Sequence, residues 1–324
     1  RVESGQNTAS HEKGMENQKP LSFAEKEKIC ESIFISEGPF WHLYTDGRCM
    51  QNIFNDSDDF KCGMNLLAVS VCRTPEIKLI AFELMENHIH LILAGDSDNC
   101  LLLFKDYKRR LKRVFRHAGH IIDWREFNAS LIAIKDIKML RNEILYTHRN
   151  AYVNKYSYTP YNYPWGSGIA YFNSVCQDIP VKDFNDLTYD DRRAFAHIRD
   201  IRRLDKLKFN KSTVHIPSFC DISLGESIFN DPRSYFNSLT RNAEAFSEIA
   251  SRLKDSIFIT DDEMFSIARS IAEELFNIKQ LTLLDPDQKI RIAKELHFRF
   301  NANKQQLKRI LKLEIAILNE IFPG

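Results

Sequence analysis

Two histidines at alternating positions are the first residues of this chain whose types and spacing suit chemistry. His88 and His90 lie in the run Asn-His-Ile-His-Leu-Ile-Leu at positions 87–93, which has the apolar composition of a β-strand. Because side chains alternate along a strand, both imidazoles project from one face and can bind the same cation. The competing interpretation, a pair of ordinary strand histidines, is the commoner one for an isolated His-x-His pattern.

Tyr146 and Asn150 make up the second group. Their spacing of four residues places both side chains on one face of a helix. A tyrosine oxygen can act as a covalent nucleophile when a metal ion or a base activates it, and the Asn150 amide offers that metal a third ligand. A tyrosine packed half-buried against a sheet is the alternative for Tyr146. The nearby tyrosines that compete for the same role are Tyr152, Tyr156, Tyr158, Tyr161 and Tyr163.

A strongly basic segment follows the histidine pair. Although the net charge of the chain is only +1, residues 105–116 contain seven cations and a single acid, Asp106. Such a local imbalance favours contact with nucleic-acid phosphates over a merely solvated helix face. The tyrosines at 152, 156 and 158 suit stacking on unpaired bases and packing on the domain equally well. The basic residues are Lys105, Lys108, Arg109, Arg110, Lys112, Arg113 and Arg116.

The elements that must position these residues alternate between strands and helices. Strands are expected at residues 40–45, 76–84, 87–93 and 129–134, where apolar and β-branched residues concentrate. Helices are expected to begin near Asp58, near Ser97 or Asp98, and after Asp136, with the last one running to about Val153. The order β-α-β-β-α-β-α predicts an α+β fold with a ferredoxin-like antiparallel sheet and helices on one of its faces.

Four short motifs occur in a specific order and spacing. They are residues 54–60 (Phe-Asn-Asp-Ser-Asp-Asp-Phe), residues 82–93 around the histidine pair, residues 146–150 (Tyr-Thr-His-Arg-Asn) and residues 163–167 (Tyr-Pro-Trp-Gly-Ser). Over roughly residues 36–172 this pattern resembles the REP-associated tyrosine transposases, which are relatives of the single-tyrosine HUH transposases.

The resemblance implies both a fold and an activity. It implies a ferredoxin-like palm that binds a divalent cation, Mg²⁺ or Mn²⁺, through His88, His90 and Asn150. It also implies that Tyr146 attacks a phosphodiester of single-stranded or hairpin DNA. The products are a 5′-phosphotyrosine link and a free 3′-OH, and attack by a 3′-OH reverses the step. Related transposases often act as homodimers with shared active sites, which the sequence leaves open here.

Two of the motifs depart from the family's pattern. The family's Met-Pro-Asn-His is replaced by Met-Glu-Asn-His at 85–88, and its Asn-Pro-Val-Arg-Ala by Asn-Ala-Tyr-Val-Asn at 150–154. Without the second proline the helix can continue and shift Tyr146 relative to the metal. A DNA-binding regulator of the same fold that does not cut is therefore the alternative function. An RNA-binding module is less favoured, because the aromatic sheet signature of such modules is missing.

Residues 256–324 are predicted to form a helical domain. Thr260 and Glu263 have the spacing of a capping box, residues 285–288 begin a helix with a proline at its first position, and residues 301–303 interrupt it. Two short helices around a tight turn are typical of a helix-turn-helix that contacts duplex DNA, and also of bundles that bind no DNA. The cations expected to contact DNA here are Lys304, Lys308 and Arg309.

The predicted domains are an N-terminal tail (1–35), the catalytic domain (36–175), a mixed linking region (176–255) and the helical domain (256–324).

The sequence lacks the glycine-rich patterns of Rossmann and P-loop nucleotide sites. Its seven cysteines are dispersed without a Cys-x-x-Cys pair, which favours reduced thiols. No apolar run reaches membrane-spanning length. The expected location is the bacterial cytoplasm, in association with the nucleoid.

Overall fold

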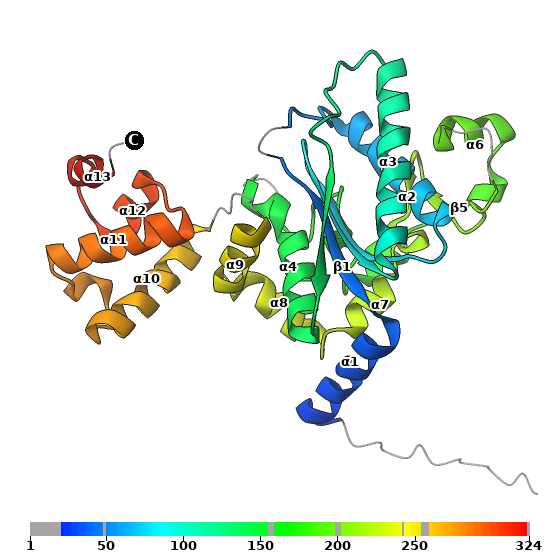
Figure 1. The fold of residues 1–324 in the computed structure, drawn as a ribbon. Coiled ribbons are helices and arrows are strands. Elements are labelled where there is room, and N and C mark those ends of the chain that lie inside the picture. Colours follow the sequence, from blue (N-terminus) through cyan, green and yellow to red (C-terminus); the bar gives the residue numbers. More distant parts are fainter. Residues whose placement is uncertain are drawn as a thin grey trace, which may run out of the picture.

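A computed structural model describes residues 21–47, 50–154, 159–197, 202–241, 243–253 and 259–322 of the chain. These residues form an α+β fold in which helices surround one antiparallel sheet of four strands (Figure 1). The α+β class and the antiparallel sheet predicted from the sequence are therefore confirmed. None of the helices described is both long and apolar enough to cross a lipid bilayer.

The sheet has the strand order β2-β3-β1-β4. The four strands lie where the sequence predicts them, but β3 begins at Ile89 rather than at residue 87. Residues 85–88 form the turn between β2 and β3, closed by a hydrogen bond from the Met85 N–H to the His88 carbonyl (2.9 Å), so His88 lies just outside the strand. The bounds are β1 Phe40–Thr45, β2 Lys78–Leu84, β3 Ile89–Ala94 and β4 Ala129–Ile134.

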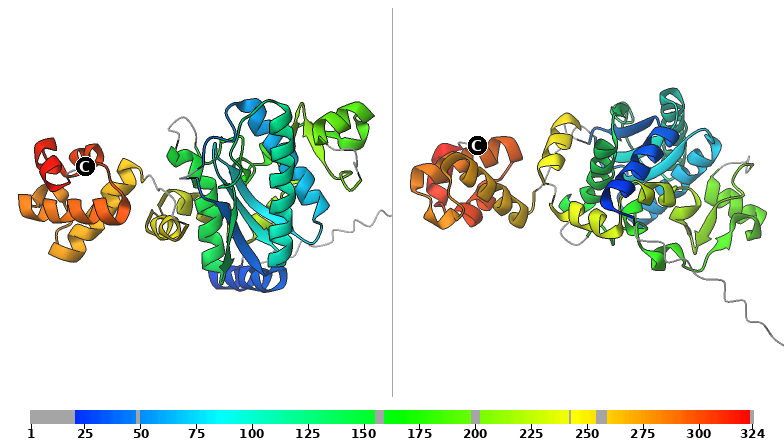
Figure 2. Two further views of the ribbon diagram at one scale, coloured as in Figure 1. Left: turned by 45° about the horizontal axis from the view of Figure 1, so that its top comes forward. Right: turned by 90° about the horizontal axis from the view of Figure 1, so that it is seen from below.

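Helices cover both faces of the sheet. Helices α2 (Ser57–Arg73) and α3 (Ser97–His117) pack together over one face, whereas α4 (Ile137–Asn154) lies on the opposite face (Figure 1 and Figure 2). There α4 packs against α8 (Pro232–Arg241) and α9 (Ala243–Leu253). The expectation of helices on one face is wrong for α4, because polar side chains of this helix pair with polar side chains on that side of the sheet.

Regions outside the predicted catalytic domain pack onto the same core. Helix α1 (Phe23–Glu37) lies mostly within the predicted tail, and its Cys30 is buried. The region 176–255 adds a small antiparallel sheet, β5-β6-β7, and its Phe184 and Leu239 join the hydrophobic core. The elements between α4 and α8 are η1 Ser167–Ile169, α5 Ser174–Gln177, β5 Lys182–Asp183, η2 Phe184–Asp186, α6 Tyr189–Ala196, β6 Lys208–Asn210, β7 Thr213–Val214, η3 Ile216–Ser218 and α7 Ile222–Ser227.

The C-terminal helices have a hydrophobic core of their own, to which Met264, Leu296 and Leu307 belong. The predicted capping box at Thr260 is present, and the break after residue 300 is confirmed, because Asn301 ends the helix in the left-handed conformation (φ 54°). The elements are α10 Asp261–Phe276, η4 Leu281–Leu283, α11 Pro286–Phe300, α12 Lys304–Leu311 and α13 Ile315–Ile321.

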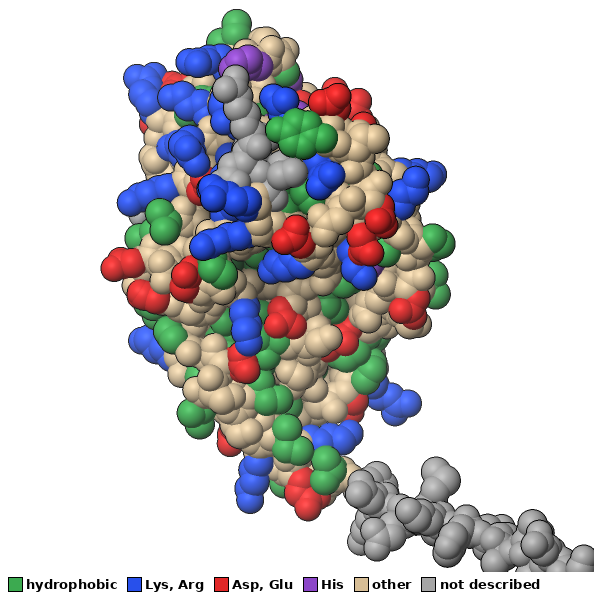
Figure 3. Space-filling model, turned by 90° about the vertical axis from the view of Figure 1, so that its right-hand side faces the viewer, with side chains coloured by type: hydrophobic (Ala, Val, Ile, Leu, Met, Phe, Trp, Pro, Cys, Tyr) green, Lys and Arg blue, Asp and Glu red, His purple; other side chains and the backbone are tan. Residues whose placement is uncertain are grey.

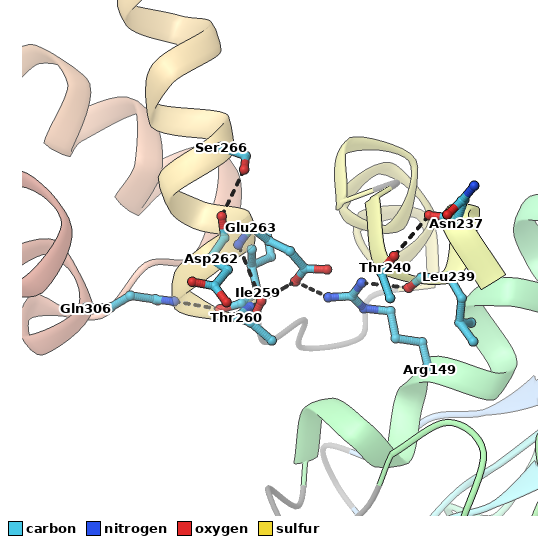
Figure 4. Close-up of polar contacts among 10 residues, drawn as sticks. All are labelled: Arg149, Asn237, Leu239, Thr240, Ile259, Thr260, Asp262, Glu263, Ser266 and Gln306. Atoms are coloured by element: carbon cyan, nitrogen blue, oxygen red, sulfur yellow. Dashed lines mark hydrogen bonds and ion pairs between the residues drawn. The ribbon is translucent and has the colours of Figure 1, made fainter. Parts of the chain in front are cut away.

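A buried ion pair joins these helices to α4 (Figure 4). The Arg149 guanidinium pairs with the Glu263 carboxylate on α10 and donates a second hydrogen bond to the Leu239 carbonyl on α8 (3.2 Å). It also lies 4.7 Å from the centre of the Phe246 ring on α9. Glu263 is at the same time the third residue of helix α10, where its side chain completes the capping box begun by Thr260. Both charged side chains are buried, so each one needs the other.

We expect Glu263→Gln to lower the free energy of unfolding by about 3 kcal/mol, because it leaves the buried Arg149 charge without its carboxylate. Glutamine preserves the capping box, so the loss reports the ion pair. Asp261→Asn, which removes an exposed ion pair with Arg309, is the control and should cost less than about 1 kcal/mol. Urea unfolding followed by circular dichroism measures both, and equally small losses would contradict the structural importance of the pair.

Candidate functional site

The four residues predicted to form the site lie together on the α4 side of the sheet. The Asn150 Nδ2 atom is 2.9 Å from His90 Nε2, and the Tyr146 ring packs edge-on against the His90 ring, with centroids 5.6 Å apart. The His88 ring is perpendicular to that of His90, with centroids 5.1 Å apart. The convergence of two imidazoles, an amide and a phenol is the arrangement that the sequence motifs led us to expect.

Strand register and helix periodicity together produce this cluster. His90 lies directly opposite Tyr44 on β1 and Glu83 on β2, so these three side chains project from the same face of the sheet. On α4, Tyr146 and Asn150 lie one turn apart and face that side. The buried Glu83 carboxylate and the Tyr44 ring, which is parallel to the His90 ring at 6.4 Å, were not identified from the sequence.

A chain of buried polar side chains continues from His90. Its Nδ1 atom lies 3.0 Å from His42 Nε2, and His42 Nδ1 lies 2.7 Å from the Glu143 carboxylate. Arg252 on α9 pairs with the other oxygen of Glu143. The sequence offered two signals for these residues: His42 alternates with Tyr44 in an otherwise apolar strand, and Glu143 lies on the same helix face as Tyr146 and Asn150, three and seven residues before them.

The donor set of this cluster is compatible with a divalent cation. Two ligands at about 2.1 Å from an octahedral ion lie about 3 Å apart, close to the 2.9 Å between His90 Nε2 and the Asn150 amide. The amide must then present its oxygen, and the two ends of an amide are exchanged by a simple rotation. Among the described residues, no three His, Cys, Asp or Glu side chains group to hold a metal; the expected set has an asparagine as its third member.

The competing tyrosines differ in what the structure says of them. Tyr163 is buried, and its hydroxyl donates to the Leu84 carbonyl (2.7 Å). Tyr161 is exposed, and its ring packs against Phe236 on α8. The side chain of Tyr152, and Tyr156 and Tyr158 entirely, lie outside the described residues. Among the described tyrosines of this group, Tyr146 is therefore the one whose ring contacts the histidine cluster.

The predicted basic segment forms most of α3, and four of its cations follow one exposed face. These are Lys105, Arg109, Lys112 and Arg116, spaced by four, three and four residues, and we call them the basic stripe. Lys and Arg side chains gather on the upper half of the molecular face shown in Figure 3. Because α3 and α4 cover opposite faces of the sheet, the basic stripe and the histidine cluster do not share a face.

Several basic residues of α3 have partners within the protein, and one member of the stripe, Arg109, pairs with Asp106. Arg110 is buried and pairs with Asp106 (2.6 Å), so it serves packing rather than phosphate contact. Lys108 donates to the Asn128 amide oxygen (3.0 Å), and Arg113 to the His197 carbonyl. The sequence alone did not separate these residues from the stripe, because charge density does not reveal which helix face is exposed.

The predicted DNA-contacting cations of the C-terminal domain also differ in exposure and in ion pairing. Lys308 is exposed and Lys304 half-buried, but Arg309 forms a two-point ion pair with Asp261 on α10 (2.5 and 3.0 Å). A different set of cations surrounds a hollow of about 600 Å³ between α10, η4 and α12, and the described residues that line it include no Asp or Glu. Its cations are Arg269, Lys279, Lys289 and Lys312.

One more buried histidine fixes the position of α4. His148 is fully buried and lies 2.9 Å from the Tyr235 hydroxyl and 2.7 Å from the Ser167 hydroxyl. Burial lowers the pKa of His148 to about 3, so the imidazole stays neutral in the folded protein. Its contacts join α4 to α8 and η1 on the side of the helix that faces away from His42.

The lowered pKa of His148 predicts a loss of stability in acid. Below about pH 6.5 the unfolded chain binds a proton that the folded protein refuses, so the free energy of unfolding falls by up to about 1.4 kcal/mol per pH unit until the folded pKa of about 3 is reached. The free energy of unfolding of the His148→Gln variant should decrease less steeply than that of the wild type between pH 6.5 and 5. Urea unfolding at several pH values measures both. A variant with the wild-type slope would show that another group causes the loss.

Comparison with known proteins adds no relative. No family model, curated protein or solved structure matches this chain.

Proposed function

We propose that the chain nicks and rejoins single-stranded DNA, with Tyr146 as the nucleophile and a divalent cation, Mg²⁺ or Mn²⁺, bound by His88, His90 and Asn150. The observation that carries the proposal is the contact set of His90, whose Nε2 atom meets the Asn150 amide (2.9 Å) while the Tyr146 ring packs against its face. A phenol beside a potential metal site is the combination that phosphodiester attack by tyrosine requires. This is the activity of the HUH transposases that the motifs resemble.

The reaction can be written in terms of the chain's own residues. The Tyr146 oxygen forms a bond to phosphorus, the bond from phosphorus to the 3′-oxygen breaks, and the 5′-phosphate stays on the tyrosine. The phenolic proton is lost, and the departing 3′-oxygen takes up a proton. His88, His90 and Asn150 would hold the cation, which when bound polarises the phosphate and stabilises its developing charge. Attack by a 3′-OH reverses the step.

The topology supports a ferredoxin-like palm as the frame of this site. In that fold two β-α-β units place their strands in an order in which the first and third are neighbours and the second and fourth are at the edges. The order β2-β3-β1-β4, with α2 and α3 on one face, has this form. On this proposal α4 is an addition to the palm that brings Tyr146 to the free face of the sheet.

The basic surfaces support DNA as the substrate. The basic stripe on α3 and the cation-lined hollow of the C-terminal domain both suit a phosphate backbone, the second through the helix-turn-helix that we propose for α11 to α13. The basic stripe and Tyr146 lie on opposite faces of the sheet. A DNA strand that contacts both must therefore pass around an edge of the sheet. In a homodimer the stripe of one chain could instead lie beside the site of its partner.

One observation favours the alternative, a DNA-binding regulator that does not cut. The Tyr146 side chain is only 4% exposed, and His90 is 1% exposed, so a phosphodiester reaches them only if the site opens. A protein that merely binds DNA through its basic surfaces needs no such opening. Covalent capture of DNA separates the two functions directly.

We expect the wild-type chain, incubated with Mn²⁺ and single-stranded hairpin DNA carrying a 3′-label, to form an adduct that survives denaturing electrophoresis. Tyr146→Phe should form none, because it lacks the attacking oxygen. Tyr161→Phe and Tyr163→Phe are matched controls and should retain the adduct, since the Tyr161 ring packs against Phe236 and the Tyr163 hydroxyl donates to the Leu84 carbonyl. Adducts from Tyr146→Phe would assign the nucleophile elsewhere. If the wild-type chain forms no adduct with any hairpin tried, the DNA-binding regulator is favoured.

A second prediction concerns the basic stripe. Replacing Lys105 and Lys112 by Gln should weaken DNA binding in 0.1 M salt and reduce the slope of log affinity against log salt by about one unit per lost phosphate contact. Lys61→Gln, at a half-buried lysine on α2 that pairs with Asp58, is the control. Fluorescence anisotropy at several salt concentrations measures all three proteins. Unchanged slopes in the double variant would remove α3 from the DNA-binding surface.

A further inference from the structure

Three buried side chains, Glu143, His42 and His90, form a continuous row that we call the histidine relay. The contacts are 2.7 Å from the Glu143 carboxylate to His42 Nδ1 and 3.0 Å from His42 Nε2 to His90 Nδ1. Glu143 and His42 are fully buried, and His90 is 1% exposed. Polar groups removed from water to this extent must satisfy one another, so each contact fixes where a proton lies.

The first proton of the relay is set by Arg252. Its guanidinium can only donate, and it pairs with one oxygen of Glu143. The other oxygen of Glu143 lies 2.7 Å from His42 Nδ1 and accepts its N–H. An imidazole that donates from Nδ1 offers the lone pair of its Nε2 atom as an acceptor, so His42 Nε2 is the accepting atom of the relay.

The position of the hydrogen between His42 and His90 follows from that of the hydrogen between His42 and Glu143. His42 Nε2, as an acceptor, requires a donor at 3.0 Å, and that donor is the N–H at Nδ1 of His90. His90 is then the tautomer whose Nε2 atom carries the lone pair, and this atom faces the Asn150 amide at 2.9 Å. Hydrogen bonds from beyond the ligands commonly fix a metal-binding histidine in this way.

We infer that Glu143 and His42 are positioning residues, which hold His90 in the Nδ1–H tautomer and so present its Nε2 lone pair as a metal ligand. The use of that lone pair for a cation rests on the proposed function, whereas the tautomer itself does not. The relay joins β1, β3 and α4 to α9, so the ligand atom of His90 is specified through Glu143 by an arginine that follows Glu143 in the chain by 109 residues.

The tautomer can be measured without metal or DNA. In the full chain labelled with ¹⁵N-histidine, the two ring nitrogens of His90 have distinct chemical shifts, and a His90→Gln spectrum assigns them. We expect a protonated Nδ1 and an unprotonated Nε2 in the wild-type protein. A wild-type His90 protonated at Nε2 would overturn the inference, whether or not the protein nicks DNA.

The Glu143→Gln variant tests whether Glu143 sets the tautomers of His42 and His90. Arg252 can only donate, so the new amide must turn its oxygen toward Arg252 and its NH₂ toward His42. His42 then accepts at Nδ1, donates from Nε2 and forces His90 into the Nε2–H form, so both histidines should exchange tautomers. Thr147→Val is the matched control: Thr147 is also buried on α4, but its hydroxyl donates to the Glu143 backbone carbonyl. The control should keep the wild-type tautomers.

Metal affinity gives a second readout of the same variants. Titration with Mn²⁺ followed by electron paramagnetic resonance should show an affinity at least about tenfold lower for Glu143→Gln than for the wild type, and no comparable change for Thr147→Val. Unchanged His90 shifts in a folded Glu143→Gln protein would contradict the relay. If the tautomers behave as expected but no DNA adduct forms, the relay stands and the nicking proposal fails.

Discussion

The burial of polar side chains on α4 is the constraint on which the rest of the structure depends. Thr147 and His148 are fully buried, and Arg149 and Asn150 nearly so, in four consecutive positions of one helix. Consecutive residues point in different directions around a helix, so these groups cannot share one partner surface. Burying a polar group without a hydrogen bond costs roughly 1–3 kcal/mol, and an unpaired charge costs more. Helix α4 must therefore be enclosed by elements that each satisfy one of its sides.

Each element around α4 provides hydrogen-bond or ion-pair partners for the polar side chains on one side of this helix. The sheet meets Glu143 and Asn150 through His42 and His90, while α8 and η1 meet His148. The C-terminal domain meets Arg149 through Glu263, and α9 returns to Glu143 through Arg252. Parts of the chain that lie more than a hundred residues apart are brought together because residues 143–150 of a single helix are all buried. This also explains why the region 176–255 shares its core with the sheet rather than linking two independent domains.

The strand bounds, the helix starts and the site motifs could be predicted from the sequence, because each depends on residues a few positions apart. The strands at Phe40–Thr45 and Ala129–Ile134 were identified at their true bounds, because apolar and β-branched residues there are bounded by turn residues. The capping boxes at Thr260 and Asp285 mark helix starts, since the capping side chain binds backbone groups three residues away. The site motifs were found for a similar reason: alternation brings two histidines close on one face, and a spacing of four joins Tyr146 to Asn150.

The relay and the side of the sheet on which α4 lies depend on contacts between distant residues. Nothing near Glu143 reveals His42 or Arg252, which are 101 and 109 residues away in sequence. Spacing likewise cannot show that Arg309 is held by Asp261, 48 residues away, whereas the pairing of Arg110 with Asp106, four residues before it on one helix, follows a local rule.

Closure of the site and admission of a DNA strand make opposite demands on these contacts. Tyr146 can be exposed only if α4 and its neighbours separate, and the contacts around α4 differ in what that separation costs. Both ends of the Arg149–Glu263 pair are buried, so parting them leaves two desolvated charges. The Arg252 side chain is 35% exposed, so water can take over its role when it leaves Glu143. Of these two ion pairs, only Arg252–Glu143 has an end that water already reaches, and Arg252 is also the residue that fixes the hydrogen positions of the histidine relay.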